Sequence, residues 1–273
     1  MIKSICPICD TTSRTWKTID KFEVFKCPNC GHGFIFPMPK DLSIFYDKDY
    51  AKTYMPGTNT EAFRDRFIQY ITDAELLEKY YSEEHCRVLD FWCSTGIFLT
   101  CMKDKWEKAG FEVNNYELKH LKANTKSMKI FSKIEEIYGK FDIVTIRGVI
   151  EHLTDFKPLF SVLEKNLKKG GIVYMCATPD FSSPAAILYK ERWNQISVPY
   201  HCHQFTQASI ALLFAQNGFG LKALYHPYED TPYTKSNDLK TFINNSKESH
   251  IINMGNTHHA YPGTMMSLIF IKK

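Results

Sequence analysis

Two pairs of cysteines near the start of the chain have the spacing of a metal site. The pairs, each of the form C-x-x-C, are Cys6, Cys9, Cys27 and Cys30. Four thiolates are a complete tetrahedral set for zinc, and such a closed set is structural because it leaves no position for a reacting water. Residues 16–26, between the pairs, alternate in the manner of short strands. We therefore predict a structural Zn²⁺ in a small zinc ribbon over residues 1–40.

The stretch VLDFWCSTGIFL, residues 88–99, has the outline of a nucleotide-binding turn. An apolar strand carries Asp90, a short loop follows, and a helix begins after Gly96. Loops of this kind usually contain two or three glycines, whereas this one has a single glycine and Trp92. The outline indicates a cofactor site, and the composition leaves open whether that site still binds its ligand.

Alternating strands and helices in the rest of the chain determine where such a loop would lie. We expect helices over residues 61–81, 97–109, 119–126, 156–167 and 206–217. We expect strands over residues 87–91, 113–118, 128–131, 141–146, 172–178, 221–225 and 265–271. This alternation predicts an α/β fold, with a mostly parallel sheet, helices on both faces and ligands at the carboxyl ends of the strands. Residues 41–84 are interpreted as a helical linker or cap, and residues near 181–203 and 227–263 as insertions.

The composition is that of a soluble globular protein. The 273 residues carry a net charge of +4, and 44% of them are hydrophobic. That charge is too small and too dispersed for a dedicated nucleic-acid binder. The longest apolar runs are too short to span a bilayer, and the first residues lack the apolar core of a secretory signal. We therefore expect a cytoplasmic protein with no membrane partner, whose nine cysteines are not a disulfide framework.

From residue 86 onward, the order of these blocks resembles a class I S-adenosylmethionine-dependent methyltransferase. The resemblance is carried by VLDFWCSTGIFL, NNYEL, FDIVTIRGVIEHLTD, LKKGGIVYMCATPD and HCHQFTQASIALLFAQNGF. With the cysteine pairs and FPMPKDLSIFYDKDY included, the chain is similar to zinc-ribbon methyltransferases of sugar and secondary metabolism. The resemblance implies a Rossmann-like, doubly wound, seven-stranded sheet in residues 85–273 and S-adenosyl-L-methionine as the cofactor. It also implies a small-molecule acceptor, a sugar or nucleotide-sugar, methylated at a hydroxyl or a carbon.

The resemblance also assigns cofactor-binding positions along this body. They are Asp90, Trp92, Cys93, Ser94, Gly96, Phe98, Glu117, Leu118 and Arg147. Glu117, at the expected end of the second strand, would hold the ribose hydroxyls, because a carboxylate only accepts hydrogen bonds. Trp92 and Ser94 depart from the family pattern, since they stand where the family loop usually has glycines.

Two later segments, RGVIEH and PYHCHQF, carry the candidate catalytic groups Glu151, His152, His201 and His203. A hydroxyl or carbon acceptor needs a base to take its proton, and histidine titrates near the working pH. His152 is the first candidate base, and a structural hydrogen bond is the competing interpretation. Some relatives that act on ubiquinone precursors bind a metal here through two carboxylates and a histidine. Gly148 replaces the first of those carboxylates, which argues against a catalytic metal.

Candidate substrate-binding residues are Tyr46, Tyr50 and Arg147. The two tyrosines share one face of an expected helix, where packing is the alternative role. Arg147 offers a planar fork of donors to a phosphate or carboxylate, or to a salt bridge at the rim of the sheet. Two other functions stay open: a catalytically silent binding protein, and an RNA methyltransferase that grips RNA with the ribbon. A homodimer is also possible.

Overall fold

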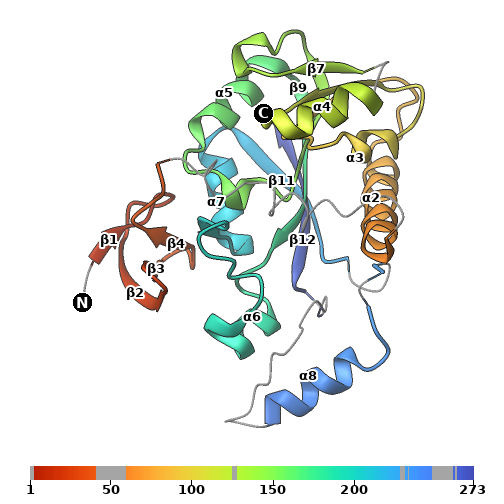
Figure 1. The fold of residues 1–273 in the computed structure, drawn as a ribbon. Coiled ribbons are helices and arrows are strands. Elements are labelled where there is room, and N and C mark those ends of the chain that lie inside the picture. The colour runs from red at the N-terminus through yellow and green to blue at the C-terminus, as the bar shows by residue number, and fades with distance from the viewer. Residues whose placement is uncertain are drawn as a thin grey trace.

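The computed structural model describes residues 3–40, 60–124, 128–227, 231–232, 234–247, 261 and 263–273. Within them, a small N-terminal sheet lies beside a larger α/β body (Figure 1). None of the helices in these ranges is long and apolar enough to cross a membrane. Tyr46 and Tyr50, two of the predicted substrate-binding residues, lie outside the described residues.

The N-terminal sheet is antiparallel and has five strands. Its order is β1-β2-β3-β4-β10, from β1 (Lys3–Ile5), β2 (Thr12–Ile19), β3 (Phe22–Lys26), β4 (Gly33–Phe36) and β10 (His203–Gln204). Strand β10 comes from the body and pairs with β4. The ribbon is therefore completed by a strand that lies about 170 residues later in the sequence.

The body is built on a seven-stranded sheet of the predicted kind. Its order is β11-β12-β9-β8-β5-β6-β7. The strands are β5 (Arg87–Phe91), β6 (Glu107–Phe111), β7 (Lys129–Phe131), β8 (Phe141–Arg147), β9 (Leu167–Pro179), β11 (Phe219–Tyr225) and β12 (Met265–Lys272). Strands β5 to β9 are parallel, whereas β12 runs antiparallel to both of its neighbours. The mostly parallel, doubly wound α/β fold is confirmed.

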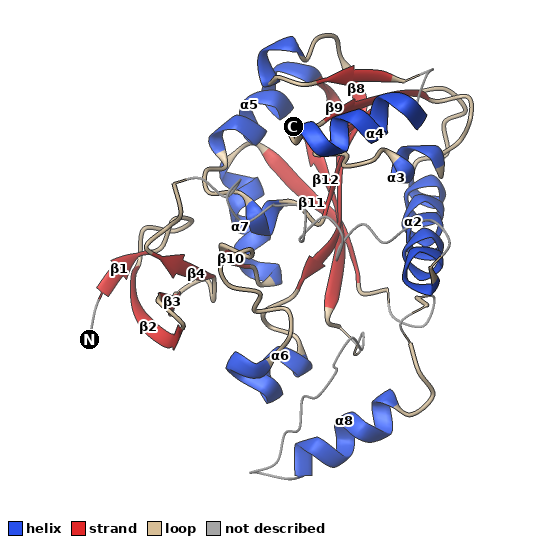
Figure 2. Ribbon diagram, in the orientation of Figure 1, coloured by secondary structure: helices blue, strands red, loops and turns tan. Residues whose placement is uncertain are grey.

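Helices cover both faces of this sheet (Figure 2). One face carries α2 (Glu61–Tyr80), α3 (Ile97–Thr100) and α4 (Asn115–Asn124), and the other carries α5 (Lys157–Asn166) and α7 (Gln207–Gln216). Helices α6 (Pro184–Tyr189) and α8 (Asp238–Lys247) lie beyond the end of the sheet, and the short 3₁₀ turns are η2 (Ile134–Glu136), η3 (Ile150–His152) and η4 (Lys190–Arg192). Successive residues of a strand point to opposite faces. Accordingly, Leu89 packs in one core cluster with α5 and α7, while Val88 packs in a second with α2 and α4. Two apolar layers therefore sandwich the sheet.

The segment between β5 and α4 differs from its prediction. The helix expected over residues 97–109 ends at Thr100, and the strand expected over 113–118 is replaced by β6, Glu107–Phe111, and the start of α4. Gly110, the residue directly after the expected helix, lies inside β6. A Cβ on Gly110 would come within 2.5 Å of the Cys93 Sγ, so glycine is there to admit that side chain.

The insertion after β9 forms a core of its own. Phe181, Tyr189, Trp193 and Ile196 pack together there, and Trp16 of the ribbon packs against them. This insertion then leads to β10 and to Thr206, the N-cap residue of α7. It therefore joins the ribbon to the edge of the body.

The strand order creates a switch point between β5 and β8. The chain runs outward from β5 through β6 to β7 and then returns to place β8 on the other side of β5. Crossovers leave the sheet in opposite directions on either side of this point, which opens a crevice at the carboxyl ends of the two strands. The loop after β5 and the turn η3 after β8 both begin at this crevice.

Candidate functional site

The loop after β5 has the backbone of a glycine-rich turn although two of its residues are not glycine. Trp92, Ser94 and Gly96 have φ angles of 60°, 50° and 75°. This left-handed region costs a residue with a Cβ about 1 kcal/mol or more. These are the positions at which the family loop has glycines or, at Gly96, retains one. The loop therefore has a glycine-like backbone at two residues, Trp92 and Ser94, that are not glycine.

Glu112 holds this loop in place. One carboxylate oxygen, Oε2, accepts the backbone N–H of Ser94 at 2.9 Å, and the other accepts those of Val113 and Asn114 at 2.7 Å each. Glu112 follows β6 directly and is 4% exposed. Its buried charge is thus satisfied by three amides from two neighbouring loops, which offsets the strain after β5.

Glu112, not Glu117, is the acidic residue at the end of the second strand. Glu117 lies in the first turn of α4, so its predicted place at a strand end is wrong. The missed signal is the sequence EKAGF, which forms β6 and places a glutamate immediately after it. Glu117 nevertheless neighbours Glu112: burial, together with that charge, raises the pKa of Glu117 to about 8. The two carboxyl groups therefore form a pair that retains a proton at neutral pH.

Asp90 lies inside β5, at the switch point. Its carboxylate accepts a hydrogen bond of 2.6 Å from the Thr145 hydroxyl on β8. Burial raises the pKa of Asp90 to about 7 despite that bond. Asp90, the loop 92–96, Glu112 and Glu117 are called the strand-tip site from here on.

Several predicted cofactor-binding residues are core residues of the body. Cys93, Phe98 and Leu118 are at most 8% exposed and pack in the cluster shared with α2. Trp92 is half-buried and packs against the cluster on the opposite face of the sheet. Their side chains stabilise the loop and helix that surround the strand-tip site.

Arg147, at the end of β8, is already paired with α2. Its Nε donates to the Asp73 carboxylate at 2.8 Å, and Gln69 donates to the same carboxylate at 3.0 Å. The guanidinium also lies 4.3 Å from the centre of the Tyr70 ring. Of the two predicted roles of Arg147, the structure therefore shows the salt bridge, which neutralises Asp73 and anchors α2 to the site.

A second group of polar side chains combines the turn η3, after β8, with the insertion before β10. Glu151, His152 and His201 each bring a potential ligand atom within 4.8 Å of the others. They are called the histidine cluster below. Burial raises the pKa of Glu151 to about 8 and lowers those of His152 and His201 to about 3 and 4. Both imidazoles are therefore neutral at physiological pH, and each alone is a weak base.

His203 lies in the contact between ribbon and body, not in the histidine cluster. Its Nδ1 is 3.0 Å from the Nε2 of His32, and its ring packs on Phe156 and Phe205. It is 2% exposed and is part of β10. The structure therefore gives His203 a packing role and argues against its prediction as a base.

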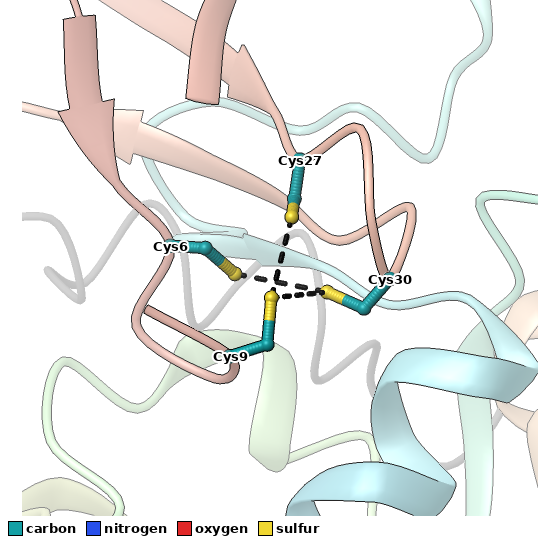
Figure 3. A group of neighbouring side chains, drawn as sticks. All are labelled: Cys6, Cys9, Cys27 and Cys30. Carbon is teal, nitrogen blue, oxygen red and sulfur yellow. Dashed lines mark hydrogen bonds between the residues drawn. The ribbon is translucent and has the colours of Figure 1, made fainter. Parts of the chain in front are cut away.

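The four ribbon cysteines converge as predicted (Figure 3). The Sγ of Cys9 lies 3.4 Å from that of Cys27 and 3.6 Å from that of Cys30, and the Sγ of Cys6 lies 3.7 Å from that of Cys30. A tetrahedral Zn²⁺ with Zn–S bonds of about 2.3 Å requires sulfurs about 3.8 Å apart. The donor set and its spacing fit a structural zinc.

Comparisons with known proteins agree with this architecture. Residues 60–224, more than half of the chain, match the family model described as a methyltransferase domain. The plantazolicin methyltransferase BpumL in complex with SAH superposes with a TM-score of 0.55 at 15% identity, covering 85% of this chain and 93% of that one. PH0226 from Pyrococcus horikoshii OT3 gives 0.55 at 17% identity, with coverages of 83% and 100%.

A third solved structure extends the same likeness. YcgJ from Bacillus subtilis superposes with a TM-score of 0.52 at 14% identity, covering 74% of this chain and 98% of that chain. The search of curated proteins found no match. At these identities the solved structures show a shared fold, and the match to the family model shows the family.

Proposed function

The chain belongs to the methyltransferase-domain family, and we propose that it transfers a methyl group from S-adenosylmethionine to a hydroxyl or carbon of a small metabolite, such as a sugar or nucleotide-sugar. The observation that carries the proposal is the strand-tip site. There, three left-handed backbone positions and two buried carboxylates meet at the switch point of the sheet. Ligands of open α/β sheets bind at this point.

The residues of the strand-tip site suit the cofactor. A carboxylate offers about four acceptor positions, and Glu112 uses three of them for backbone amides. The ribose hydroxyls are donors, so one can take the fourth position and replace the proton that Glu117 retains. The left-handed turn keeps Cβ atoms from the side on which the ligand approaches. S-adenosylmethionine, when bound, supplies an activated methyl group on a positively charged sulfur.

The histidine cluster is proposed to face the acceptor. It follows β8, and Glu151 also contacts the end of β9, where the Thr178 hydroxyl donates to its carboxylate at 3.4 Å. Methyl transfer requires the acceptor atom in line with the methyl group, so rigid positioning contributes much of the rate. His152 and His201 are held by backbone carbonyls at 2.9 and 2.7 Å, which fixes their rings for this purpose.

Calorimetric titration of the purified chain with S-adenosylmethionine and with SAH tests the proposal. We expect one site per chain with micromolar affinity, and methyl transfer from labelled cofactor to at least one acceptor in a panel of sugars and nucleotide-sugars. Absence of binding at millimolar cofactor would overturn the enzyme and favour a silent binding protein. Binding with transfer only to RNA would overturn the acceptor class. The comparisons favour neither of these alternatives.

A further inference from the structure

The histidine cluster has the composition of an open metal site. Glu151 and His152 lie on η3, after β8, and His201 comes from the insertion that precedes β10. One potential ligand atom from each lies within 4.8 Å of the others, separate from the four cysteines of the ribbon. The set contains two imidazoles and one carboxylate, the ligands of many catalytic Zn²⁺ sites and of other divalent transition-metal sites.

Hydrogen bonds determine which nitrogen of each histidine carries a proton. The Nδ1 of His152 lies 2.9 Å from the carbonyl oxygen of Tyr200, and the Nδ1 of His201 lies 2.7 Å from that of Gln195. A carbonyl only accepts, so Nδ1 is the protonated nitrogen in both rings and Nε2 has the lone pair. A backbone carbonyl on the second nitrogen is the arrangement that orients metal-binding histidines.

The remaining member, Glu151, is also oriented and has space beside it. The Thr178 hydroxyl donates to its Oε2 at 3.4 Å, and its side chain is buried. A Cβ placed on Gly148 would be 3.8 Å from its nearest neighbour, a backbone oxygen, and 4.0 Å from the Glu151 Oε1. Gly148 supplies no ligand itself, and the fold brings His201 to the cluster as the third.

We propose that Glu151, His152 and His201 bind a divalent transition-metal ion such as Zn²⁺ or Co²⁺, with coordination positions left open for an oxygen of the methyl acceptor. Its role rests on the proposed function: the ion would orient the acceptor and polarise its hydroxyl, which lowers the pKa of that hydroxyl. The sequence argued against a metal here because Gly148 replaces a carboxylate and because no ligand pair lies next to His201 in the sequence; in the fold, Glu151 and His152 are that pair.

Cobalt titration of the metal-stripped full chain tests the site independently of activity. Cobalt bound by cysteines has an intense sulfur-to-metal charge-transfer band, whereas cobalt bound by histidine and carboxylate has only weak d–d bands. We expect two Co²⁺ per chain, one of each spectral type. His201→Ala should abolish the second type and leave the cysteine band unchanged. His85→Ala, a control at an exposed histidine outside the cluster, should keep both.

One equivalent in the unmodified chain, or a second equivalent that persists in His201→Ala, would overturn the site. If His201→Ala fails to fold, Glu151→Gln preserves side-chain size and should weaken the second Co²⁺ on the order of 100-fold. Calorimetry with SAH on the same samples separates the two proposals. Two cobalt ions without SAH binding would refute the proposed function alone, and SAH binding with one cobalt would refute the metal site alone.

Discussion

The ribbon site and the strand-tip site are assembled in opposite ways. Each cysteine pair spans four residues, so short-range spacing alone gives the donor set of the ribbon. The strand-tip site joins Asp90 on β5, the loop after it, and Glu112 after β6, with Thr145 of β8 beneath. Its geometry depends on which strands are neighbours. The first kind of site is visible in the sequence, while the second requires the sheet order and the strand boundaries.

The ribbon site is connected to the histidine cluster through the insertion before α7. Strand β10 pairs with β4, and the Thr206 hydroxyl donates to the carbonyl of Cys30 at 2.9 Å. His201, in the histidine cluster, is two residues before β10. Metal binding in the ribbon should therefore stabilise the segment that holds His201.

The largest expected effect is that of Cys27→Ser, which tests this connection. Loss of a thiolate removes the closed zinc set, and structural zinc contributes on the order of 10 kcal/mol to folding in such modules. We expect loss of one metal per chain, rapid proteolysis within residues 1–40 and a loss of methyl transfer. Metal analysis and limited proteolysis measure the result.

Cys101→Ser is the matched control, because this thiol belongs to the body and donates to the carbonyl of Ile97. It should keep its zinc and its resistance to proteolysis. Full zinc content in Cys27→Ser would show that the four cysteines are not the ligands. Normal transfer by a chain whose ribbon is cleaved would show that the ribbon and the histidine cluster are independent.

The next effect is that of Glu112→Gln on the cofactor. Glutamine has one accepting oxygen where the carboxylate has two, so an amide of Ser94 or of the Val113–Asn114 turn loses its partner. Hydrogen bonds to charged groups contribute about 1.5–3 kcal/mol. We expect SAH affinity, measured by calorimetry, to fall about 10- to 100-fold.

Glu107→Gln makes the same change at the start of β6, the strand that Glu112 follows, at an exposed salt bridge to Arg87. It should leave SAH affinity unchanged. If Glu112→Gln also binds within about twofold of the unmodified chain, Glu112 does not organise the cofactor site.

A smaller effect concerns Glu117 and pH. Its pKa in the folded chain, about 8, is above the ordinary value of 4.5. Between these pH values the folded state keeps a proton that the unfolded state releases, so stability falls as pH rises. Glu117→Gln removes this loss. We expect similar melting temperatures for the two proteins at pH 4.5, and at pH 8 a variant that melts at least about 2–4 °C higher, the shift produced by each 1 kcal/mol.

Glu135→Gln, at an exposed glutamate, is the control and should follow the unmodified chain at both pH values. Equal dependence on pH in Glu117→Gln and the unmodified chain would mean that Glu117 does not hold the proton of the Glu112–Glu117 pair.

The errors of the sequence predictions lie where tertiary contacts override local pattern. Long periodic elements such as α2 and the apolar strands β5 and β8 agree with prediction within one or two residues. The short strand β6 does not agree with prediction. By its residue type alone Gly110 indicates the end of a helix, whereas in the fold it leaves room for the Cys93 side chain. That error displaced the second strand and led to Glu117 in place of Glu112. Contacts of His201 and His203 could not be predicted, since these two residues, only two positions apart, lie in two different environments.

The smallest expected effect is that of Trp92→Gly, which asks whether a family-like glycine would improve the loop. Glycine adopts a φ of 60° without strain, which should raise the free energy of unfolding by about 1–2 kcal/mol. The lost indole packing and the greater entropy of glycine in the unfolded chain should lower it by a similar amount. We expect unfolding free energy within about 1 kcal/mol of the unmodified chain and SAH affinity within about threefold, because the indole packs against the core. Trp92→Val, with a β-branched side chain in the same left-handed position, should destabilise by about 2 kcal/mol or more. A tenfold gain in SAH affinity in Trp92→Gly would identify the native loop as degenerate, and a tenfold loss would place the indole on the cofactor.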